Sequence, residues 1–376
     1  MNGTDKGEQF NISTEIIRVI PIASKIISNE RLLLLLDKYD NAFIYPNTEE
    51  AKINALNVMS RLTFSRISES KNILTGHKFS PKGLNGVEVW RTNFQNAGEE
   101  IIAHASDDQL NPDEYQGIVE NDGNITYKYV NPNLMAIATI SSPNRLNIYI
   151  IDRVNGAIIH ISQVYNIDRK KQVKIIFVEN IIMVNYFKEY GEVNGGLLNE
   201  ILTIELYYPT IEDDTQKMIF RYLSDGIQVG GINSISLPKP KVLMQTYVLP
   251  VVTKDLLLTR TLQGITNKHV LILTNHNKVM AMPAILFSAK RPTDNPNRDG
   301  VEFEDATLIP YDSIIRISHT FTLNYNLELN GITQIKSLPQ KYESTTLMIG
   351  SGIDLFVSHF APEKVSSSLT LRNMMV

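Results

Sequence analysis

A strand–turn–strand pattern that recurs along the chain is the feature that most constrains its fold. In its clearest copy, two runs rich in β-branched and aromatic residues, within Leu146–Ile161, flank a turn that contains Asn155-Gly156. Asn-Gly supplies the positive φ angles that a tight hairpin turn requires. Leu33–Tyr45 and Val270–Met282 repeat the same order at unequal spacing. The sequence therefore predicts a series of hairpins with degenerate self-similarity.

Helical signals are few. In Glu49–Leu62, apolar residues recur near a 3.6-residue period behind a polar cap at Asn47–Glu50, which predicts one short helix. Many short strands without alternating helices predict an all-β protein. A strand, then Asp-x-x-x-Gly, then a strand is the form of a hairpin in a quinoprotein-like blade. We therefore expect a partial or single β-propeller with few short helices, and a β-sandwich remains the alternative.

The densest β region runs from Lys239 to Lys364, after a boundary at Pro238–Pro240. We expect successive strands in it, with Ile314–Leu329 among them, and a last hairpin across Gly350–Gly352. Earlier in the chain, Val173–Tyr186 is also expected to be strand. This region carries no recognisable nucleophile, metal cluster or phosphate loop, so the residues alone favour a β protein that is not an enzyme.

Composition excludes several classes of function. The 376 residues carry a formal net charge of −4 and no basic block, so nothing predicts a nucleic-acid partner. The absence of cysteine excludes disulfides, thiolate metal sites and a cysteine nucleophile. The N-terminus lacks the pattern of a signal peptide. The most apolar short run, Leu32–Leu36, is far too short to cross a bilayer.

Candidate catalytic and metal-binding residues have simpler structural explanations. The seven histidines show no metal-ligand spacing, and we expect them to be surface or structural residues; they are His77, His104, His160, His269, His276, His319 and His359. The acidic pairs Asp107-Asp108 and Asp113-Glu114 could supply two carboxylates for glycoside hydrolysis, but adjacent acids in a polar loop are usually solvated. Gly350-Ser351-Gly352 lacks the helix and lysine of a phosphate loop, and Trp90 is expected to pack between sheets. We therefore predict no catalytic, cofactor-binding or metal-binding residues.

Several short segments, in order, resemble a known family. Residues 127–134 read Tyr-Lys-Tyr-Val-Asn-Pro-Asn-Leu, and a blade hairpin follows at Ile148–His160. The remaining segments are Gln263–His269, Lys290–Pro292, Leu308–Tyr311, Asn324–Asn326, Gly331-Ile332, Glu343–Thr345 and Gly352–Leu355. Together they are similar to the C-terminal lumenal part of subunit 1 of the endoplasmic reticulum (ER) membrane protein complex. The match divides the chain into a weakly matching region with one short helix (1–126), the propeller region of the family (127–364) and a divergent tail (365–376).

The resemblance implies a function. It predicts a non-catalytic lumenal scaffold at the ER membrane, in a complex that inserts tail-anchored and multipass membrane proteins. It implies other subunits as direct partners, client membrane proteins as indirect ones, and a transmembrane helix that this chain does not contain. The alternative is a quinoprotein-like enzyme or ligand-binding module, which would need a ring of acids and aromatic residues on its axis. If the domain is lumenal, Asn124 is the expected N-glycosylation site, within Asn124-Ile125-Thr126.

Overall fold

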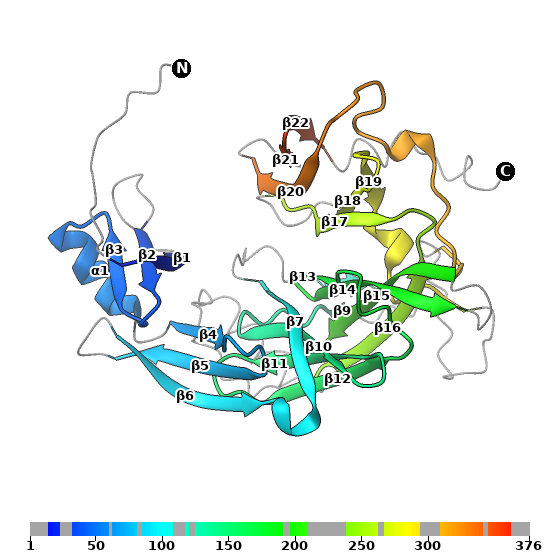
Figure 1. The fold of residues 1–376 in the computed structure, drawn as a ribbon. Coiled ribbons are helices and arrows are strands. Elements are labelled where there is room, and N and C mark those ends of the chain that lie inside the picture. The colour runs from blue at the N-terminus through cyan, green and yellow to red at the C-terminus, as the bar shows by residue number, and fades with distance from the viewer. Residues whose placement is uncertain are drawn as a thin grey trace, which may run out of the picture. The chain divides into compact units, whose positions relative to one another are not determined.

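Antiparallel sheets make up most of the described chain (Figure 1). The computed structural model describes residues 14–22, 32–59, 62–80, 85–107, 117–119, 125–190, 196–209, 238–261, 267–293, 309–340 and 345–361. They form two compact units. Among the described residues, unit 1 comprises those from 14 to 93 together with 153–156, and unit 2 comprises the others.

Unit 1 contains two three-stranded sheets and the helix. The first sheet has the order β1-β2-β3 and the second β4-β5-β6. Their bounds are β1 Ile16–Ile22, β2 Leu32–Asp37, β3 Ala42–Tyr45, α1 Glu49–Met59, β4 Thr63–Ile67, β5 Ile73–Phe79 and β6 Gly86–Asn93. Alternate residues of β2 (Leu32, Leu34, Leu36) pack with Ala55 of α1 and with Phe64 of β4 in one core. The predicted helix is confirmed, although it ends at Met59.

Unit 2 contains two four-stranded sheets, two three-stranded sheets and the two-stranded ribbon β8-β9. The four larger sheets have the orders β7-β10-β11-β12, β13-β14-β15-β16, β17-β18-β19 and β20-β21-β22. The bounds are β7 Glu99–Ser106, β8 Gly117–Val119, β9 Ile125–Tyr127, β10 Leu134–Ser141, β11 Arg145–Asp152, β12 Ile158–Val164, β13 Lys174–Val178, β14 Ile181–Tyr190, β15 Gly196–Tyr207, β16 Lys241–Val248, β17 Thr253–Leu258, β18 His269–Thr274, β19 Val279–Pro283, β20 Ile332–Pro339, β21 Thr346–Gly352 and β22 Leu355–Phe360. The short 3₁₀ helices are η1 Gln95–Ala97, η3 Ala284–Phe287 and η4 His319–Phe321.

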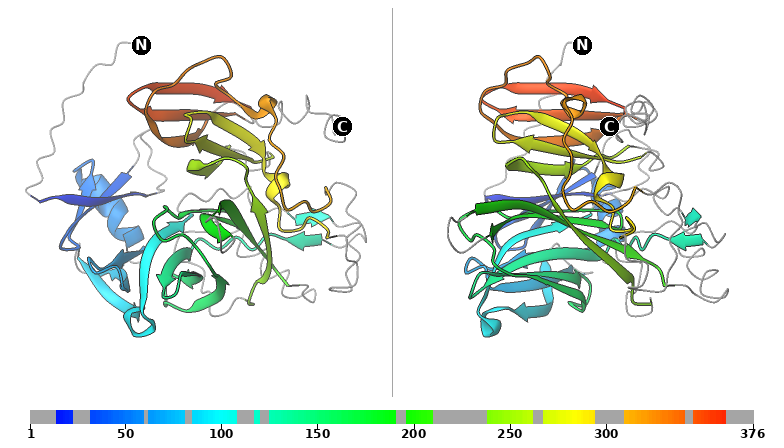
Figure 2. Two further views of the ribbon diagram at one scale, coloured as in Figure 1. Left: turned by 45° about the vertical axis from the view of Figure 1, so that its right-hand side comes forward. Right: turned by 90° about the vertical axis from the view of Figure 1, so that its right-hand side faces the viewer.

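Each apolar core of unit 2 lies between consecutive sheets (Figure 2). Residues of β10 and β11 share a core with β14 and β15, for example Ile148 with Ile204. The opposite face of the β13–β16 sheet packs on the β17–β19 sheet through residues such as Ile201 and Val270. Leu271 of β18 then points to the other side and packs against Phe356 of the last sheet. Because both faces of a middle sheet are covered, its central strand is buried at every position instead of alternating, as in β18, which reads His-Val-Leu-Ile-Leu-Thr.

The three repeated segments of the sequence are hairpins, as predicted. They form β2–β3, β11–β12 and β18–β19. The all-β prediction is therefore confirmed on the described residues.

Three finer predictions were wrong. Val173–Tyr186 is a hairpin, because β13 and β14 pair across a two-residue turn at Glu179-Asn180. Gly350–Gly352 belongs to β21, and the chain turns just beyond it at Ile353-Asp354. Ile314–Leu329 holds η4, turns and isolated bridges rather than strands, because it lies along β16 and β19 without forming a ladder.

Candidate functional site

The first strands of the four large sheets of unit 2 lie next to one another. β7 contacts β13, β13 contacts β17, and β17 contacts β20. Charged residues lie just beyond the ends of the first three of these strands. Asp107 follows β7, Glu179 follows β13 and Arg260 follows β17, and Lys128 and Lys268 join them. We call these five residues the ionic cluster.

Glu179 lies at the centre of the ionic cluster. Its side chain is fully buried, and one carboxylate oxygen lies 3.0 Å from Nζ of Lys128. The other carboxylate oxygen pairs with the Lys268 ammonium. The backbone N–H of Glu179 donates to Oδ2 of Asp107 at 2.7 Å, and Asp107 also pairs with the Arg260 guanidinium. A carboxylate can remain charged in such a buried position only when its partners replace the lost hydration.

The ionic cluster therefore connects three sheets, those that begin with β7, β13 and β17. Glu179 also occupies the left-handed region, with φ of 55°, which is uncommon for a residue with a long side chain. The surrounding contacts hold this conformation in place. The five side chains form a dense set of paired charges, and none of them is left as an unpaired base or nucleophile. The ionic cluster therefore has the chemistry of a structural contact between sheets.

A second polar contact lies near the other ends of β13 and β17 and includes β20. Asp255 of β17 accepts a hydrogen bond from the backbone N–H of Ile335 in β20 at 2.9 Å. Its other oxygen lies 3.4 Å from Nζ of Lys174 in β13. A bulge in β17, between Thr253 and Asp255, interrupts the pairing with β18 at this position. One carboxylate thus connects three neighbouring first strands.

Replacing Asp255 by Asn tests this second polar contact. We expect the free energy of unfolding to fall by about 1–2 kcal/mol, because the charge-assisted bond to Ile335 weakens and Lys174 loses its partner. Equilibrium urea unfolding measures the change. Asp168→Asn, in a turn of the same unit, is the matched control and should change stability by less than about 0.5 kcal/mol. Equal losses in the two variants would contradict the proposed role of Asp255.

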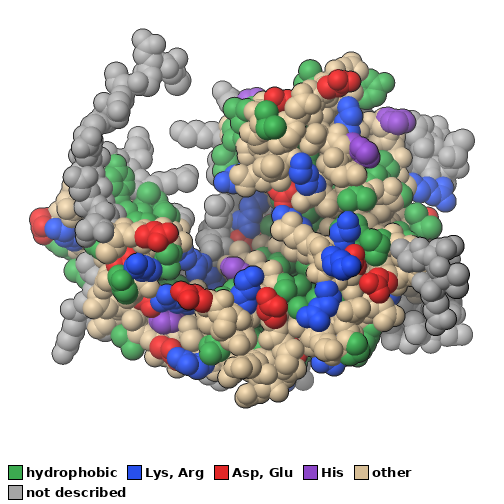
Figure 3. Space-filling view, viewed as in Figure 1, with side chains coloured by type: hydrophobic (Ala, Val, Ile, Leu, Met, Phe, Trp, Pro, Cys, Tyr) green, Lys and Arg blue, Asp and Glu red, His purple; other side chains and the backbone are tan. Residues whose placement is uncertain are grey.

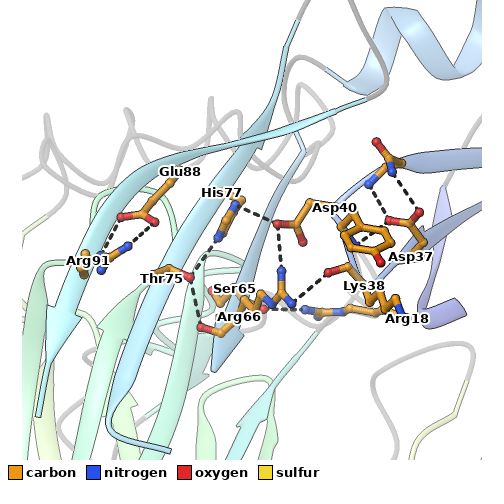
Figure 4. A network of polar contacts seen from close by, with 12 residues as sticks. Arg18, Asp37, Lys38, Asp40, Ser65, Arg66, Thr75, His77, Glu88 and Arg91 are labelled. Carbon is orange, nitrogen blue, oxygen red and sulfur yellow. Dashed lines mark hydrogen bonds and ion pairs between the residues drawn. The ribbon is translucent and has the colours of Figure 1, made fainter. Parts of the chain in front are cut away.

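A polar network in unit 1 contains a hydroxyl, an imidazole and a carboxylate in sequence (Figure 4). Thr75 Oγ1 lies 2.9 Å from Nε2 of His77, and Nδ1 of His77 lies 3.8 Å from Oδ2 of Asp40. Asp40 also accepts a hydrogen bond from Arg66 at 3.1 Å. Burial lowers the pKa of His77, with the nearby acids Asp40 and Glu88 acting in the opposite direction. A neutral His77 would be suited to act as a base, so the hydrogen-bond directions decide what the network can do.

Those directions do not support nucleophilic catalysis. The Thr75 hydroxyl donates its only proton to the carbonyl of Arg66 at 3.3 Å. The bond between Thr75 and His77 must then run from Nε2–H of His77 to Oγ1, which leaves no lone pair on Nε2 to take the hydroxyl proton. The 3.8 Å separation from Asp40 exceeds a hydrogen bond. The network therefore joins the turn after β2 to β4 and β5.

The sequence-predicted site residues are dispersed in the structure. Asp107 is buried in the ionic cluster, whereas Asp108, Asp113, Glu114 and Asn124 lie outside the described residues. His77, His160 and His269 are enclosed to different degrees, and burial lowers the pKa of each. Among the residues that the structure describes, no group of three or more acids or histidines could hold a metal ion.

Trp90, the only tryptophan, packs in unit 1. Its Nε1–H donates to the carbonyl of Arg153 at 2.8 Å. Its ring lies directly against Gly76 and Gly156, where an added Cβ atom would overlap the indole. Trp90 is therefore a packing residue, with glycines that make room for its ring.

Replacing Trp90 by Phe should lower the free energy of unfolding by about 1–2 kcal/mol. The variant loses the bond to Arg153 and leaves part of the space over Gly156 unfilled. Thermal unfolding followed by circular dichroism measures the change. Val89→Ala, at an exposed position of the same strand, is the control, and a loss as large as that of W90F would show that Trp90 has no special role.

The segments that carry the family resemblance join one another in pairs. Arg291 donates hydrogen bonds to the carbonyls of Ile309 and Pro310, and the N–H of Tyr311 donates to the carbonyl of Pro292 at 2.8 Å. Residues 331–332 and 352–355 also meet, because the N–H of Ile353 donates to the Gly331 carbonyl at 3.2 Å. A Cβ atom at Gly352 would overlap that carbonyl oxygen, so this approach requires glycine.

The segment Gln263–His269 is described only at its last three residues. Of these, Lys268 belongs to the ionic cluster through its pair with Glu179. His269 is buried, with its ring against that of Phe360. This segment therefore also contributes to contacts between sheets.

Sequence reasoning missed Glu179, Arg260 and Asp255. One signal was present, because Phe177-Val178-Glu179-Asn180 places two polar residues, the second of them a common turn residue, at the end of an apolar run. On the face shown in Figure 3, basic and acidic side chains are interspersed, so that face offers no basic stripe to a phosphate backbone. Within the described part of the chain, no helix is both long and apolar enough to cross a membrane.

Successive antiparallel sheets with shared cores, joined by paired charges at the ends of their first strands, define a β-propeller class of protein. Comparison with known proteins identifies the family. The family described as "ER membrane protein complex subunit 1, second beta-propeller" matches residues 3–363, and the chain belongs to it. The propeller prediction is thereby confirmed, as is the resemblance seen in the sequence.

Curated relatives carry the same name. The chain is 29% identical over 345 residues to ER membrane protein complex subunit 1 of Xenopus laevis, covering 89% of this chain and 32% of the relative. It is 27% identical over 326 residues to that of Schizosaccharomyces pombe, covering 86% and 32%. The chain thus spans about a third of the length of these relatives. Among solved structures, it is similar to Kuenenia stuttgartiensis hydrazine synthase at 9% identity and a TM-score of 0.42, covering 88% of this chain and 81% of that one.

Proposed function

We propose that this chain is a non-catalytic scaffold domain on the lumenal side of the ER membrane protein complex. In this proposal it holds other subunits in place while the complex inserts tail-anchored and multipass proteins. The observation that carries the proposal is the structural role of the segments that resemble the family. Lys268, Arg291, Gly331 and Gly352 all serve to join strands or sheets, which suits a domain whose task is to keep its shape and present surfaces.

Affinity purification tests the proposal. The tagged chain, expressed in cells of its source, should recover other subunits of the complex from detergent extracts. A shuffled-sequence tag fusion serves as the control. Failure to recover any subunit above this control would overturn the proposal.

The lumenal side is tested separately. We propose that Asn124 carries an N-glycan, since Asn124-Ile125-Thr126 is a sequon and the proposed location is the lumen, where such sequons are glycosylated. Endoglycosidase treatment should increase gel mobility, and Asn124→Gln should abolish that shift. An unglycosylated protein that still recovers the complex would remove the support for Asn124 while leaving the scaffold role intact.

A further inference from the structure

A braced turn in unit 2 presents two apolar side chains to solvent. The turn spans residues 323–327 and lies against the β18–β19 hairpin, where the N–H of Leu323 donates to the carbonyl of Val279 at 2.8 Å. The Asn324 side chain lies beneath it and is 1% exposed. Its Oδ1 accepts from the N–H of Val279 at 2.9 Å, and its Nδ2 donates to the carbonyls of Asn277 and Leu327 at 3.1 and 3.2 Å.

Side chains in this segment divide between the core and the surface. Phe321 and Leu323 pack into the cores of unit 2. Tyr325 and Leu327, by contrast, are 66% and 53% exposed. The exposed carboxylate of Glu328 follows directly. The fold therefore braces this turn with a buried asparagine while leaving its two largest apolar side chains outside the core.

Such a turn has the physical properties of a binding anchor. Its backbone is already ordered, so a partner would not have to order it on binding. Tyrosine is enriched among residues that dominate binding energy, since it offers a large apolar surface with a polar tip. The acidic side chain of Glu328 next to the turn disfavours approach to an anionic lipid surface, so a protein partner fits this turn better than a membrane does.

We propose that Tyr325 and Leu327 form a preformed anchor for another subunit of the complex. They would enter an apolar pocket on that subunit whose rim carries a Lys or Arg opposite Glu328. This inference rests on the proposed membership of the chain in the complex. It adds the surface through which one protein partner is held.

Site-specific photo-crosslinking tests the contact directly. A photoreactive phenylalanine analogue is placed at position 325 in the full chain, in cells that contain the complex. The control places the same analogue at position 190, because Tyr190 is 69% exposed and lies in the same unit. We expect position 325 to give an adduct with one subunit of the complex and position 190 to give at least tenfold less of it. Adducts at 325 with lipid alone, or equal subunit adducts at both positions, would overturn the proposal.

Variants of the anchor supply the second arm. Tyr325→Ser with Leu327→Ser should leave the melting temperature unchanged, because both side chains are exposed, and should reduce recovery of the crosslinked subunit by about tenfold. Glu328→Lys should reduce recovery of the same subunit by a smaller factor. The matched control, Tyr190→Ser with Leu197→Ser, removes a comparable exposed pair and should retain full recovery. If wild-type chain recovers the complex and the anchor variants do so equally well, the anchor is excluded and the scaffold role stands; if wild-type chain recovers nothing, the scaffold role itself fails.

Discussion

Replacing Glu179 by Gln should lower the free energy of unfolding by about 3 kcal/mol, the largest effect we expect from any single polar substitution in unit 2. The carboxylate is fully buried between Lys128 and Lys268, so its neutral replacement leaves two partly buried ammonium groups without their partner. Breaking a buried ion pair from one side typically costs about 3–5 kcal/mol, because the remaining charge has already lost its hydration. We place the value at the lower end because both lysine side chains retain some contact with solvent, 20% and 11%. Urea unfolding at neutral pH measures the loss.

Two further variants separate the charge from the backbone. Glu189→Gln, at an exposed position of β14, should change stability by less than about 0.5 kcal/mol. Glu179→Asn removes the long carboxylate but suits the left-handed φ of 55° better than glutamate does. If the ion pairs dominate, Glu179→Asn should be about as destabilised as the Gln variant. An Asn variant that is more stable than the wild type would show instead that the backbone strain at position 179 outweighs the ion pairs of the ionic cluster.

Acidification should destabilise the protein through His269. The side chain is fully buried between the β17–β19 and β20–β22 sheets, and its ring lies 5.1 Å from that of Phe360 in an edge-on contact. Neither ring nitrogen makes a hydrogen bond of normal geometry to a described residue. Burial therefore lowers the pKa of His269 to about 4, with the backbone of Asn267 acting in the opposite direction.

The direction of the pH dependence follows from this shift. Above pH of about 6.5 the ring is neutral in both the folded and the unfolded chain, and its contribution to stability is fully present. Between about pH 6.5 and 4 the unfolded chain binds a proton that the folded chain does not, so stability falls as the pH falls. Over the whole window the loss amounts to roughly 3 kcal/mol. Urea unfolding at several pH values between about 7 and 4 measures this loss.

Variants isolate the contribution of His269, since burial also lowers the pKa of His77 and His160. His269→Leu should reduce the dependence of stability on pH in this window, whereas His276→Gln, in the exposed turn between β18 and β19, should leave it as in the wild type. An unchanged slope in His269→Leu would show that the ring is hydrated or paired in solution.

Local patterns predicted more of the fold than of the site. Asn155-Gly156 and the alternation around it were enough to predict the β11–β12 hairpin, because the information lies within a few residues. The turn at Glu179-Asn180 was missed because its first residue is a glutamate, which local turn preferences do not favour at positive φ. Long-range contacts explain its presence. The partners of Glu179 lie 51 residues away at Lys128 and 72 residues away at Asp107, and no local pattern reports such pairings.

The family segments were recognisable without their roles being predictable. Arg291 stands in a polar loop in the sequence, yet it is 4% exposed and lies over the ring of Tyr247. Its carbonyl partners come from a segment that has no charge to suggest pairing. The sequence also carried no indication that Asp107 pairs with Arg260.

Because consecutive sheets share each apolar core, one face of a sheet stays uncovered during synthesis until the next sheet has been made. When the ribosome has completed β19 at Pro283, the face of β18 that carries Leu271 and Leu273 still lacks its covering sheet, which ends only at Phe360. At about 5–20 residues per second, the roughly 80 intervening residues take on the order of 4–16 s. During that interval the nascent chain exposes an apolar surface, which makes it a substrate for chaperones at the site of translation. A premature stop before β20 would make that exposure permanent and mark the truncated product for degradation.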